Sequence, residues 1–261
     1  MYCVSALLAL GTEMKVSIIT ATFNSAKTIS DTLNSLNNQT YFDIEHIIID
    51  GGSKDNTLSL IDNFSNRKPT VISEPDEGIY DALNKGILAA TGDIIGFLHS
   101  DDFFAYPDVV KDIVDTMNSS NVDAVYGDLH YISAINSDVI VRKWISGDFD
   151  INKMKLGWMP PHPTFYMKRT CYQKFGFFDL SYKISADYDS LLRYLWTHKI
   201  AIKYIPNVLI NMRVGGISNR SLSNMIMKTK EDIKAMKRNN LPWLTAVAGK
   251  NLSKIPQFLK K

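Results

Sequence analysis

Two adjacent carboxylates, Asp101 and Asp102, follow an apolar stretch near the middle of the chain. The stretch at 94–98 (IIGFL) predicts a buried strand, and His99 and Ser100 separate it from the aspartates. Two carboxylates at the end of a buried strand repel each other and lose hydration, so a compensating cation is expected. Mg²⁺ is often held by one or two carboxylates together with substrate phosphates. The pattern indicates either a metal site for a phosphorylated ligand or a polar turn that caps the next helix.

Polar residues also follow two earlier apolar stretches. Residues 15–20 (KVSIIT) lead to Thr22 and Asn24, and residues 44–50 (IEHIIID) end in Asp50. Helical spacing of apolar residues between such strands predicts a parallel, doubly wound α/β sheet. Ligands bind this kind of sheet outside the carboxyl ends of the strands. We therefore expect these polar residues to converge on one edge of the sheet.

The second half of the chain has a mixed pattern. Helices are expected over 107–117 and 186–198, and β-like stretches are expected over 124–129, 140–144, 164–167 and 200–210. The prolines around His162 (PPHP) require a rigid loop there. Because no internal repeat or low-complexity linker is present, we expect one continuous globule.

The composition sets outer bounds on the function. The 261 residues are 45% hydrophobic and 21% charged, with a formal net charge of +2, which gives no reason to expect a nucleic-acid partner. Two cysteines, Cys3 and Cys171, make no disulfide framework and fit a reducing compartment. No apolar run has the roughly 18–20 residues that cross a bilayer. Residues 1–13 are expected to be a disordered extension, with Met14 as the natural start.

The motifs, taken in order, resemble those of family 2 glycosyltransferases with the GT-A fold. Within that family the chain is most similar to transferases of bacterial envelope polysaccharides, of the colanic-acid or O-antigen kind. The matching stretches are residues 16–24 (VSIITATFN), 47–57 (IIIDGGSKDNT), 73–102, 161–168 and 185–193 (SADYDSLLR).

The resemblance implies a Rossmann-like, mostly parallel sheet flanked by helices. Residues 14–104 would be the half that binds the nucleotide sugar, and residues 105–218 the mixed half for acceptor binding and catalysis. Residues 219–261 would form a basic, amphipathic helical tail.

For the donor, the resemblance places a nucleobase on the loop at 20–24. That loop includes Ala21, Asn24 and Phe23, whose ring would stack on the base unless it packs in the core. Asp50 takes the position of a nucleotide-binding carboxylate, whereas Gly51 lacks the second carboxylate that some members carry there.

The resemblance also sets Asp76, Asn84 and Lys85 against the nucleotide. A helical ion pair between Lys85 and Asp81, four residues earlier, is the alternative for this lysine.

His99, Ser100, Asp101 and Asp102 correspond to the family's metal motif, in which His99 stands where an aspartate is usual. The resemblance implies that Asp101 binds Mn²⁺ or Mg²⁺ directly and that Asp102 supports it or makes a second contact. His99 would lie near the ribose or a metal-bound water, and Ser100 within the donor site. The cation would neutralise the diphosphate leaving group.

Asp187 matches the catalytic base of inverting members, although Ala186 replaces the glutamate that usually precedes it. The alternative is a carboxylate placed for the dipole at a helix N-terminus. His162 matches a histidine near the acceptor or diphosphate. Trp158 would stack on an acceptor sugar unless it packs in the core.

The tail combines many lysines with Met, Ile, Leu, Trp and Phe, and Pro242 and Pro256 divide it into shorter helices. Such a helix either lies on an anionic membrane surface or packs on the domain with a solvated outer face. We expect contact with the inner face of the bacterial cytoplasmic membrane, on a protein that is otherwise cytoplasmic.

The expected function is inverting transfer of a sugar from a nucleotide-diphosphate sugar to a hydroxyl of a glycan or lipid-linked acceptor. One alternative is a non-catalytic sugar-nucleotide binder, suggested by His99 and Ala186. The other is a sugar nucleotidyltransferase, which the absence of glycine and basic residues at 20–24 disfavours. The sugar, the base, the acceptor and the oligomeric state stay open.

Overall fold

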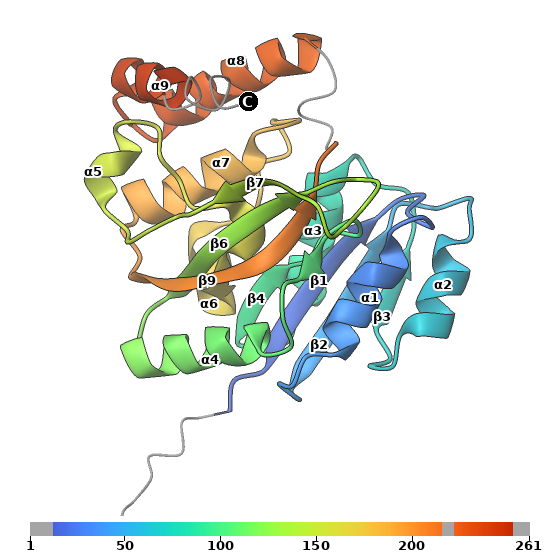
Figure 1. Ribbon diagram of the computed structural model, residues 1–261. Helices are drawn as coiled ribbons and strands as arrows, with labels where there is room; N and C mark the ends of the chain where they lie inside the picture. Colours follow the sequence, from blue (N-terminus) through green and yellow to red (C-terminus); the bar gives the residue numbers. More distant parts are fainter. Residues whose placement is uncertain (1–12, 216–221, 253–261) are drawn as a thin grey trace, which may run out of the picture.

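The structure is a computed structural model that describes residues 13–215 and 222–252 (Figure 1). Residues 1–12 of the expected extension, the expected boundary at 218–219 and the end of the tail lie outside the described residues. The first half alternates strands and helices, which confirms the α/β prediction. Its elements are β1 (Val16–Thr22), α1 (Ile29–Asn37), β2 (Ile44–Asp50), α2 (Thr57–Phe64), β3 (Thr70–Ser73), α3 (Ile79–Ala89) and β4 (Ile94–Phe97).

The second half continues the same sheet with mixed strand directions. Its strands are β5 (Phe103–Phe104), β6 (Ala124–Ile132), β7 (Ile140–Trp144), β8 (Tyr166–Lys168) and β9 (Ile202–Arg213). Its helices are α4 (Val109–Ser120), α5 (Ile151–Met154), α6 (Arg169–Phe175) and α7 (Ala186–Leu191), which continues as a π-helical turn over Leu192–Thr197. A 3-10 turn covers His162–Thr164.

One sheet joins the two halves in the order β3-β2-β1-β4-β8-β6-β9-β5, with β7 paired to β6. Strands β1 to β4 run parallel, and the direction first reverses between β4 and β8. The register sets Thr22 opposite Asp50, and Asp50 opposite Ser73. The carboxyl ends of the first strands therefore meet at one edge, as expected.

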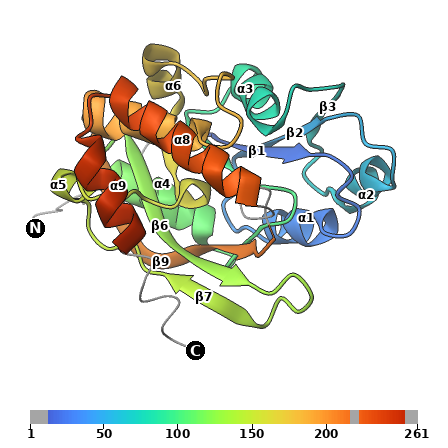
Figure 2. The same ribbon diagram turned by 90° about the horizontal axis from the view of Figure 1, so that it is seen from above.

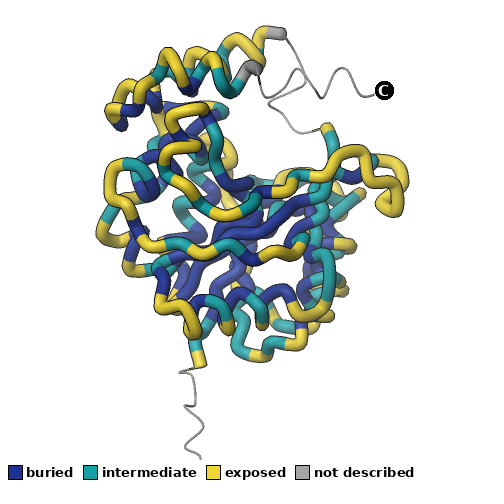
Figure 3. The backbone as a smooth tube through the Cα atoms, turned by 60° about the vertical axis from the view of Figure 1, so that its left-hand side comes forward, coloured by how far each residue is buried: buried dark blue, intermediate teal, exposed yellow. Residues whose placement is uncertain are grey.

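Helices cover both faces of the sheet, and the tube in Figure 3 shows the strands as the buried interior. One core cluster joins the sheet to α3, α6, α7 and the tail, and the other joins the opposite face to α1 and α4. Helix α3 approaches β1 closely at Gly86, where a Cβ atom would lie 2.4 Å from Ile19 Cγ2. A glycine at this position lets α3 lie against the strand, which fixes the start of α3 near the strand ends.

The described part of the tail forms α8 (Leu222–Arg238) and α9 (Trp243–Leu252). Figure 2 shows α8 crossing above the body of the molecule with α9 beside it. Ala235, Met236 and Ala246 are fully buried, so one face of these helices packs on the domain. No helix in the described ranges is long and apolar enough to cross a membrane.

Candidate donor and catalytic site

Asp50 ends β2 and is completely buried. Its Oδ2 accepts hydrogen bonds from the N–H groups of Gly52 (3.1 Å) and Ser53 (3.0 Å) and from the hydroxyl of Ser73 (2.7 Å). A carboxylate with this many protein donors is largely satisfied. Asp50 therefore fixes the loop that follows β2 and ties it to β3.

Phe23 lies outside the core, because 59% of its surface is exposed. Gly51 is its neighbour: a Cβ atom there would lie 3.4 Å from Phe23 Cδ2 and 2.5 Å from Asp76 Oδ2. Asp76 Oδ1 accepts a hydrogen bond from the N–H of Gly78 (2.9 Å). An exposed aromatic ring and a carboxylate oxygen thus face each other across a glycine, with one residue from each of three strand ends.

Asn24 connects two of these strand ends. Its backbone is left-handed (φ 50°), its N–H donates to Ser53 Oγ (2.8 Å), and its Oδ1 accepts from Lys54 N (2.8 Å). β1 extends to Thr22, beyond the predicted end at Thr20, so Ala21 lies buried inside the strand. Asn24 shapes the loop that presents Phe23.

Asn84 and Lys85 of α3 both have protein partners. The side-chain amide of Asn84 bonds to both backbone groups of Phe178, at 2.9 Å to the carbonyl and 3.0 Å from the N–H. Lys85 pairs with Glu74 (2.8 Å) and with Asp81 (3.3 Å), so the helical ion pair considered as its alternative is present. Both residues hold α3 against its neighbouring loops.

The motif residues at 99–102, which begin two residues after β4 ends, differ in their exposure and their hydrogen-bond partners. Asp102 is 1% exposed, and its Oδ1 accepts a hydrogen bond from Arg213 N (3.3 Å), while burial and the charge of Asp101 raise its pKa well above the usual range. Asp101 is partly exposed. Ser100 Oγ bonds to Ser25 Oγ at 2.8 Å. Asp101 is therefore the carboxylate of this motif that a ligand can reach.

His99 is half-buried, and its buried Nδ1 has no hydrogen-bond partner among the described residues. Burial lowers the pKa of its ring, and the charges of Asp101 and Asp187 both oppose this shift. The charges of Asp101 and Asp187 thus reach the same ring. His162 is buried, with a pKa lowered to about 4 by burial, and Asp187 again opposes the shift. The His162 ring stacks on Phe97 at the end of β4, with centroids 5.3 Å apart, so this loop lies against the strand that leads to the motif.

Asp187 is half-buried in the first turn of α7. Its Oδ1 accepts hydrogen bonds from Tyr188 N (2.8 Å) and from the Tyr80 hydroxyl (3.1 Å). The preceding segment is held from the tail, because Glu231 of α8 accepts from the N–H groups of residues 183, 184 and 185 at 2.9, 2.9 and 3.0 Å. The start of α7 is therefore held between α3 and α8.

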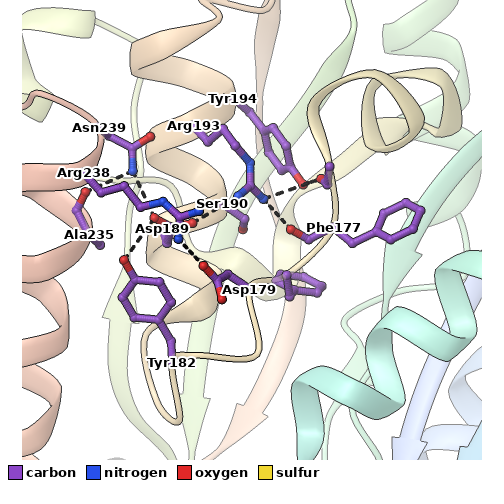
Figure 4. Close-up of polar contacts among 12 residues, drawn as sticks. Phe177, Asp179, Tyr182, Asp189, Ser190, Arg193, Tyr194, Ala235, Arg238 and Asn239 are labelled. Carbon is purple, nitrogen blue, oxygen red and sulfur yellow. Dashed lines mark hydrogen bonds and ion pairs between the residues drawn. The ribbon is translucent and has the colours of Figure 1, made fainter.

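A second network secures α7 further along the helix (Figure 4). Asp189 is 1% exposed and accepts hydrogen bonds from Arg193 Nη1 (3.1 Å) and Asn239 Nδ2 (3.0 Å). Arg238 pairs with Asp179 in the loop before α7. Charged and amide groups from three segments thus keep α7 and α8 in a fixed relation.

Asp101 alone can bind a cation only if the ligand supplies further oxygen atoms to coordinate it. Within the described ranges, no group of three or more His, Cys, Asp or Glu side chains is arranged to hold a metal. The partly exposed Asp101 beside the unpaired buried nitrogen of His99 fits a site that a metal–phosphate ligand completes.

Three of the interacting residues found here were not expected from the sequence. Tyr80 and Arg213 reach the motifs from α3 and β9, and Arg213 Nη1 donates to the Asp101 carbonyl at 2.8 Å. Glu231 lies in the tail. Trp158 is half-buried and packs edge-on against Tyr126 with ring centroids 6.0 Å apart.

Comparison with known proteins agrees with this fold. The model of the glycosyl transferase family 2 matches residues 17–185, which is more than half of the chain. An uncharacterized glycosyltransferase of Mycobacterium tuberculosis (strain CDC 1551) is 34% identical over 186 residues, covering 68% of each chain. A PGL/p-HBAD biosynthesis glycosyltransferase of Mycobacterium bovis (strain BCG) is 28% identical over 220 residues, covering 81% of this chain and 82% of the relative. The chain therefore belongs to glycosyl transferase family 2.

Solved structures confirm a GT-A-like fold. The 1–349 fragment of S. aureus TarS in complex with UDP-GlcNAc has a TM-score of 0.67 at 19% identity, covering 87% of this chain and 65% of the fragment. The Pyrobaculum calidifontis mannosyltransferase PcManGT in complex with GDP-Man and Mn²⁺ has a TM-score of 0.64 at 17% identity, covering 90% and 69%. The chain spans 43% of a longer TarS chain.

Proposed function

We propose that this protein is a metal-dependent, inverting glycosyltransferase of bacterial surface-polysaccharide synthesis. It would move a sugar from a nucleotide-diphosphate sugar to a hydroxyl of a glycan or lipid-linked acceptor. The observation that carries the proposal is a chain of contacts that joins the end of β4 to Asp187 at the start of α7. The His162 ring stacks on Phe97 of β4 with centroids 5.3 Å apart, and Phe178 packs on both His162 (5.5 Å) and Tyr80 (5.6 Å). The Tyr80 hydroxyl in turn donates to Asp187. One carboxylate serves the donor and the other serves the acceptor.

The donor's base would lie against Phe23, Gly51 and Asp76. The exposed ring of Phe23 offers a stacking face, and Gly51 lets the Asp76 carboxylate lie close to that ring, because a Cβ there would be 2.5 Å from Asp76 Oδ2. UDP-GlcNAc in TarS and GDP-Man with Mn²⁺ in PcManGT support a nucleotide sugar as donor and a divalent cation as cofactor.

Asp101 would hold the cation, and buried Asp102 would support the loop from behind through its bond to Arg213. When bound, the cation would neutralise charge on the departing diphosphate. His162, buried beside His99, would remain neutral at physiological pH because burial lowers its pKa to about 4. A neutral imidazole there can donate a hydrogen bond to the diphosphate or acceptor.

Asp187 would act as general base on the acceptor hydroxyl. The acceptor oxygen forms a bond to the anomeric carbon while the bond from that carbon to the diphosphate oxygen breaks. The nucleoside diphosphate leaves with the bonding electron pair, and the hydroxyl proton passes to Asp187. Attack opposite the leaving group inverts the anomeric configuration.

Contact with an anionic membrane would occur through the outer side of the tail. Met225, Ile226 and Leu244 are 53%, 58% and 67% exposed, respectively. Lys230, Lys234 and Lys237 are exposed on α8 as well. Apolar and basic side chains on a helix that is otherwise packed on the domain suit a peripheral contact.

A thermal-shift panel of UDP, GDP, dTDP and CMP sugars, each with Mn²⁺ or Mg²⁺, tests the donor site. A bound ligand raises the Tm by mass action, so one nucleotide class is expected to stabilise the protein more when the cation is present. Asp101→Asn should lose the cation-dependent part of the shift, and Asp138→Asn, an exposed carboxylate outside the site, should keep it. Equal shifts with and without cation would contradict the metal site.

A non-catalytic sugar-nucleotide binder would pass the same panel. Transfer is distinguished by nucleoside diphosphate that forms only when an acceptor is present. A nucleotidyltransferase would instead release pyrophosphate from a nucleoside triphosphate.

A further inference from the structure

We infer that Tyr80 is a positioning residue for the catalytic base: its hydroxyl fixes one oxygen of Asp187 and thereby presents the other oxygen to the acceptor. This inference rests on the proposed role of Asp187. The Tyr80 hydroxyl lies 2.6 Å from the carbonyl oxygen of Ile184 and 3.1 Å from Asp187 Oδ1. It comes from α3, in the donor-binding half, and reaches across 107 residues of sequence.

The two oxygens of Asp187 have different surroundings. Oδ1 accepts from Tyr80 and from the backbone N–H of Tyr188 (2.8 Å). Oδ2 receives no hydrogen bond from any residue in the described ranges. Two donors on one oxygen prevent the carboxylate from rotating freely, so Oδ2 is the oxygen that takes the proton of the acceptor hydroxyl.

The phenol is well suited to act as a donor. Burial, with the charge of Asp187 next, raises the pKa of Tyr80 far above its ordinary value, so the hydroxyl keeps its proton throughout the working range. The ring is held by Phe178, with centroids 5.6 Å apart. The position of the hydroxyl is therefore set by packing as well as by its two acceptors.

The Tyr80 hydroxyl has one hydrogen and two acceptors. Its hydrogen bond to Asp187 therefore depends on whether that carboxylate is ionised. An ionised Asp187 is the stronger acceptor and attracts the hydrogen, whereas a protonated Asp187 leaves it with the Ile184 carbonyl. The contact is therefore made with the form of Asp187 that can take the acceptor's proton. Other charged or titratable groups that act on Asp187 are His99, His162 and Lys250, and Glu231 acts on Tyr80.

The test is the pH–rate profile of Tyr80→Phe, with donor and acceptor saturating. Loss of one hydrogen bond to a charged acceptor should lower kcat about tenfold and move the acidic limb toward higher pH. The donor KM should stay within about twofold, because Tyr80 contacts the catalytic base Asp187 and not the nucleotide. Fluorotyrosine at position 80, a stronger donor, should move the acidic limb the opposite way.

Tyr194→Phe is the matched control. The Tyr194 hydroxyl donates to the Gly176 carbonyl at 2.6 Å, so this variant loses the same kind of bond to a carbonyl without a carboxylate (Figure 4). It should lower the Tm and leave the acidic limb in place.

Failure of the positioning role of Tyr80 and failure of Asp187 as the base give different results. If Asp187→Asn is impaired while Tyr80→Phe and the fluorotyrosine variant keep the wild-type kcat and acidic limb, the positioning role is wrong and the proposed function stands. If Asp187→Asn itself turns over normally, the proposed base is wrong.

Discussion

At the scale of single residues, the site depends on which polar groups already have protein partners. Three side chains bind neighbouring loops of the protein: those of Asp50, Asn84 and Lys85. The side chains of Phe23 and Asp101 are exposed enough for a ligand to contact them. The first group supports the shape of the site, and the second is where a ligand can be bound. Gly51 lies between the two, because only a residue without a side chain lets the Asp76 carboxylate approach Phe23 this closely.

Gly51→Ala should weaken nucleotide binding. The new methyl group would lie 2.5 Å from Asp76 Oδ2, so Asp76 must move into the space expected for the base. An overpacking cost of about 1–3 kcal/mol would reduce affinity about tenfold or more, measured by calorimetry with the best nucleotide of the panel. Gly176→Ala is the control: its φ of +88° strains any side chain but nothing lies within 4 Å, so the Tm should fall while the affinity is kept.

Sequence motifs placed most of the candidate site residues but not their supporting partners. The family resemblance named Asp101 and Asp187 together, and their shared role stays a prediction. Tyr80 could not be found in this way, because its acceptors lie more than 100 residues further along the chain and depend on the packing of α3 against α7. Glu231 was not predicted, because the tail was interpreted only from its basic and apolar residues.

At the scale of elements, the tail contributes to the site rather than only covering the domain. Glu231 accepts three backbone N–H groups of the segment that leads into α7, and Asp232 accepts from Ser185 Oγ (2.8 Å). The orientation of Asp187 therefore depends on α8. Of the two expectations for the tail, packing on the domain is what its described part shows.

Glu231→Gln should lower both stability and kcat. The amide keeps the shape of the side chain, but one carboxylate oxygen becomes an NH₂ group that faces N–H donors. We expect a loss of about 2 kcal/mol in the free energy of unfolding and a larger loss in kcat than in donor affinity. Urea unfolding and steady-state kinetics would measure these. Asp115→Asn, which removes an exposed ion pair with Lys111 on α4, should change neither by much. A Glu231→Gln protein as stable and as active as wild type would show that α8 does not position the site.

Short elements explain the differences between the expected and observed folds. β5 has two residues and α5 has four, too few for any periodic pattern to appear. The seven-residue α6 was also missed; it buries Cys171 and Tyr172 in the core. The 186–198 helix was found, but its second part is π-helical. Long strands with continuous apolar runs, such as β1 and β2, were predicted to within two residues at each end.

At the scale of the whole molecule, the α/β body carries exposed apolar and basic side chains on α8. The order in which β8 lies between β4 and β6 brings the first and second halves of the chain into one sheet. Sequence patterns predicted a β-like stretch at 164–167 but could not give this order, because a strand of only three residues does not show which strands it pairs with. The resemblance to a family supplied what local patterns lacked.

Binding to anionic lipid vesicles should depend on α8. Replacing Met225 and Ile226 together by serine removes two exposed apolar side chains and should reduce co-sedimentation severalfold, and raised salt should reduce it further by screening the lysines. Ile135→Ser, at a side chain that is 98% exposed in the β6–β7 turn, should leave co-sedimentation unchanged. Equal co-sedimentation of all three proteins would rule out this surface as the contact.

The central claim is that Asp187 receives the acceptor's proton in a site it shares with Asp101. The most direct test compares Asp187→Asn with wild type in acceptor-dependent release of nucleoside diphosphate and in donor affinity. Asparagine fills the same volume but cannot take the proton, so turnover should fall by about 10²–10⁴ while the donor Kd stays within about twofold. Wild-type turnover in Asp187→Asn would contradict the account.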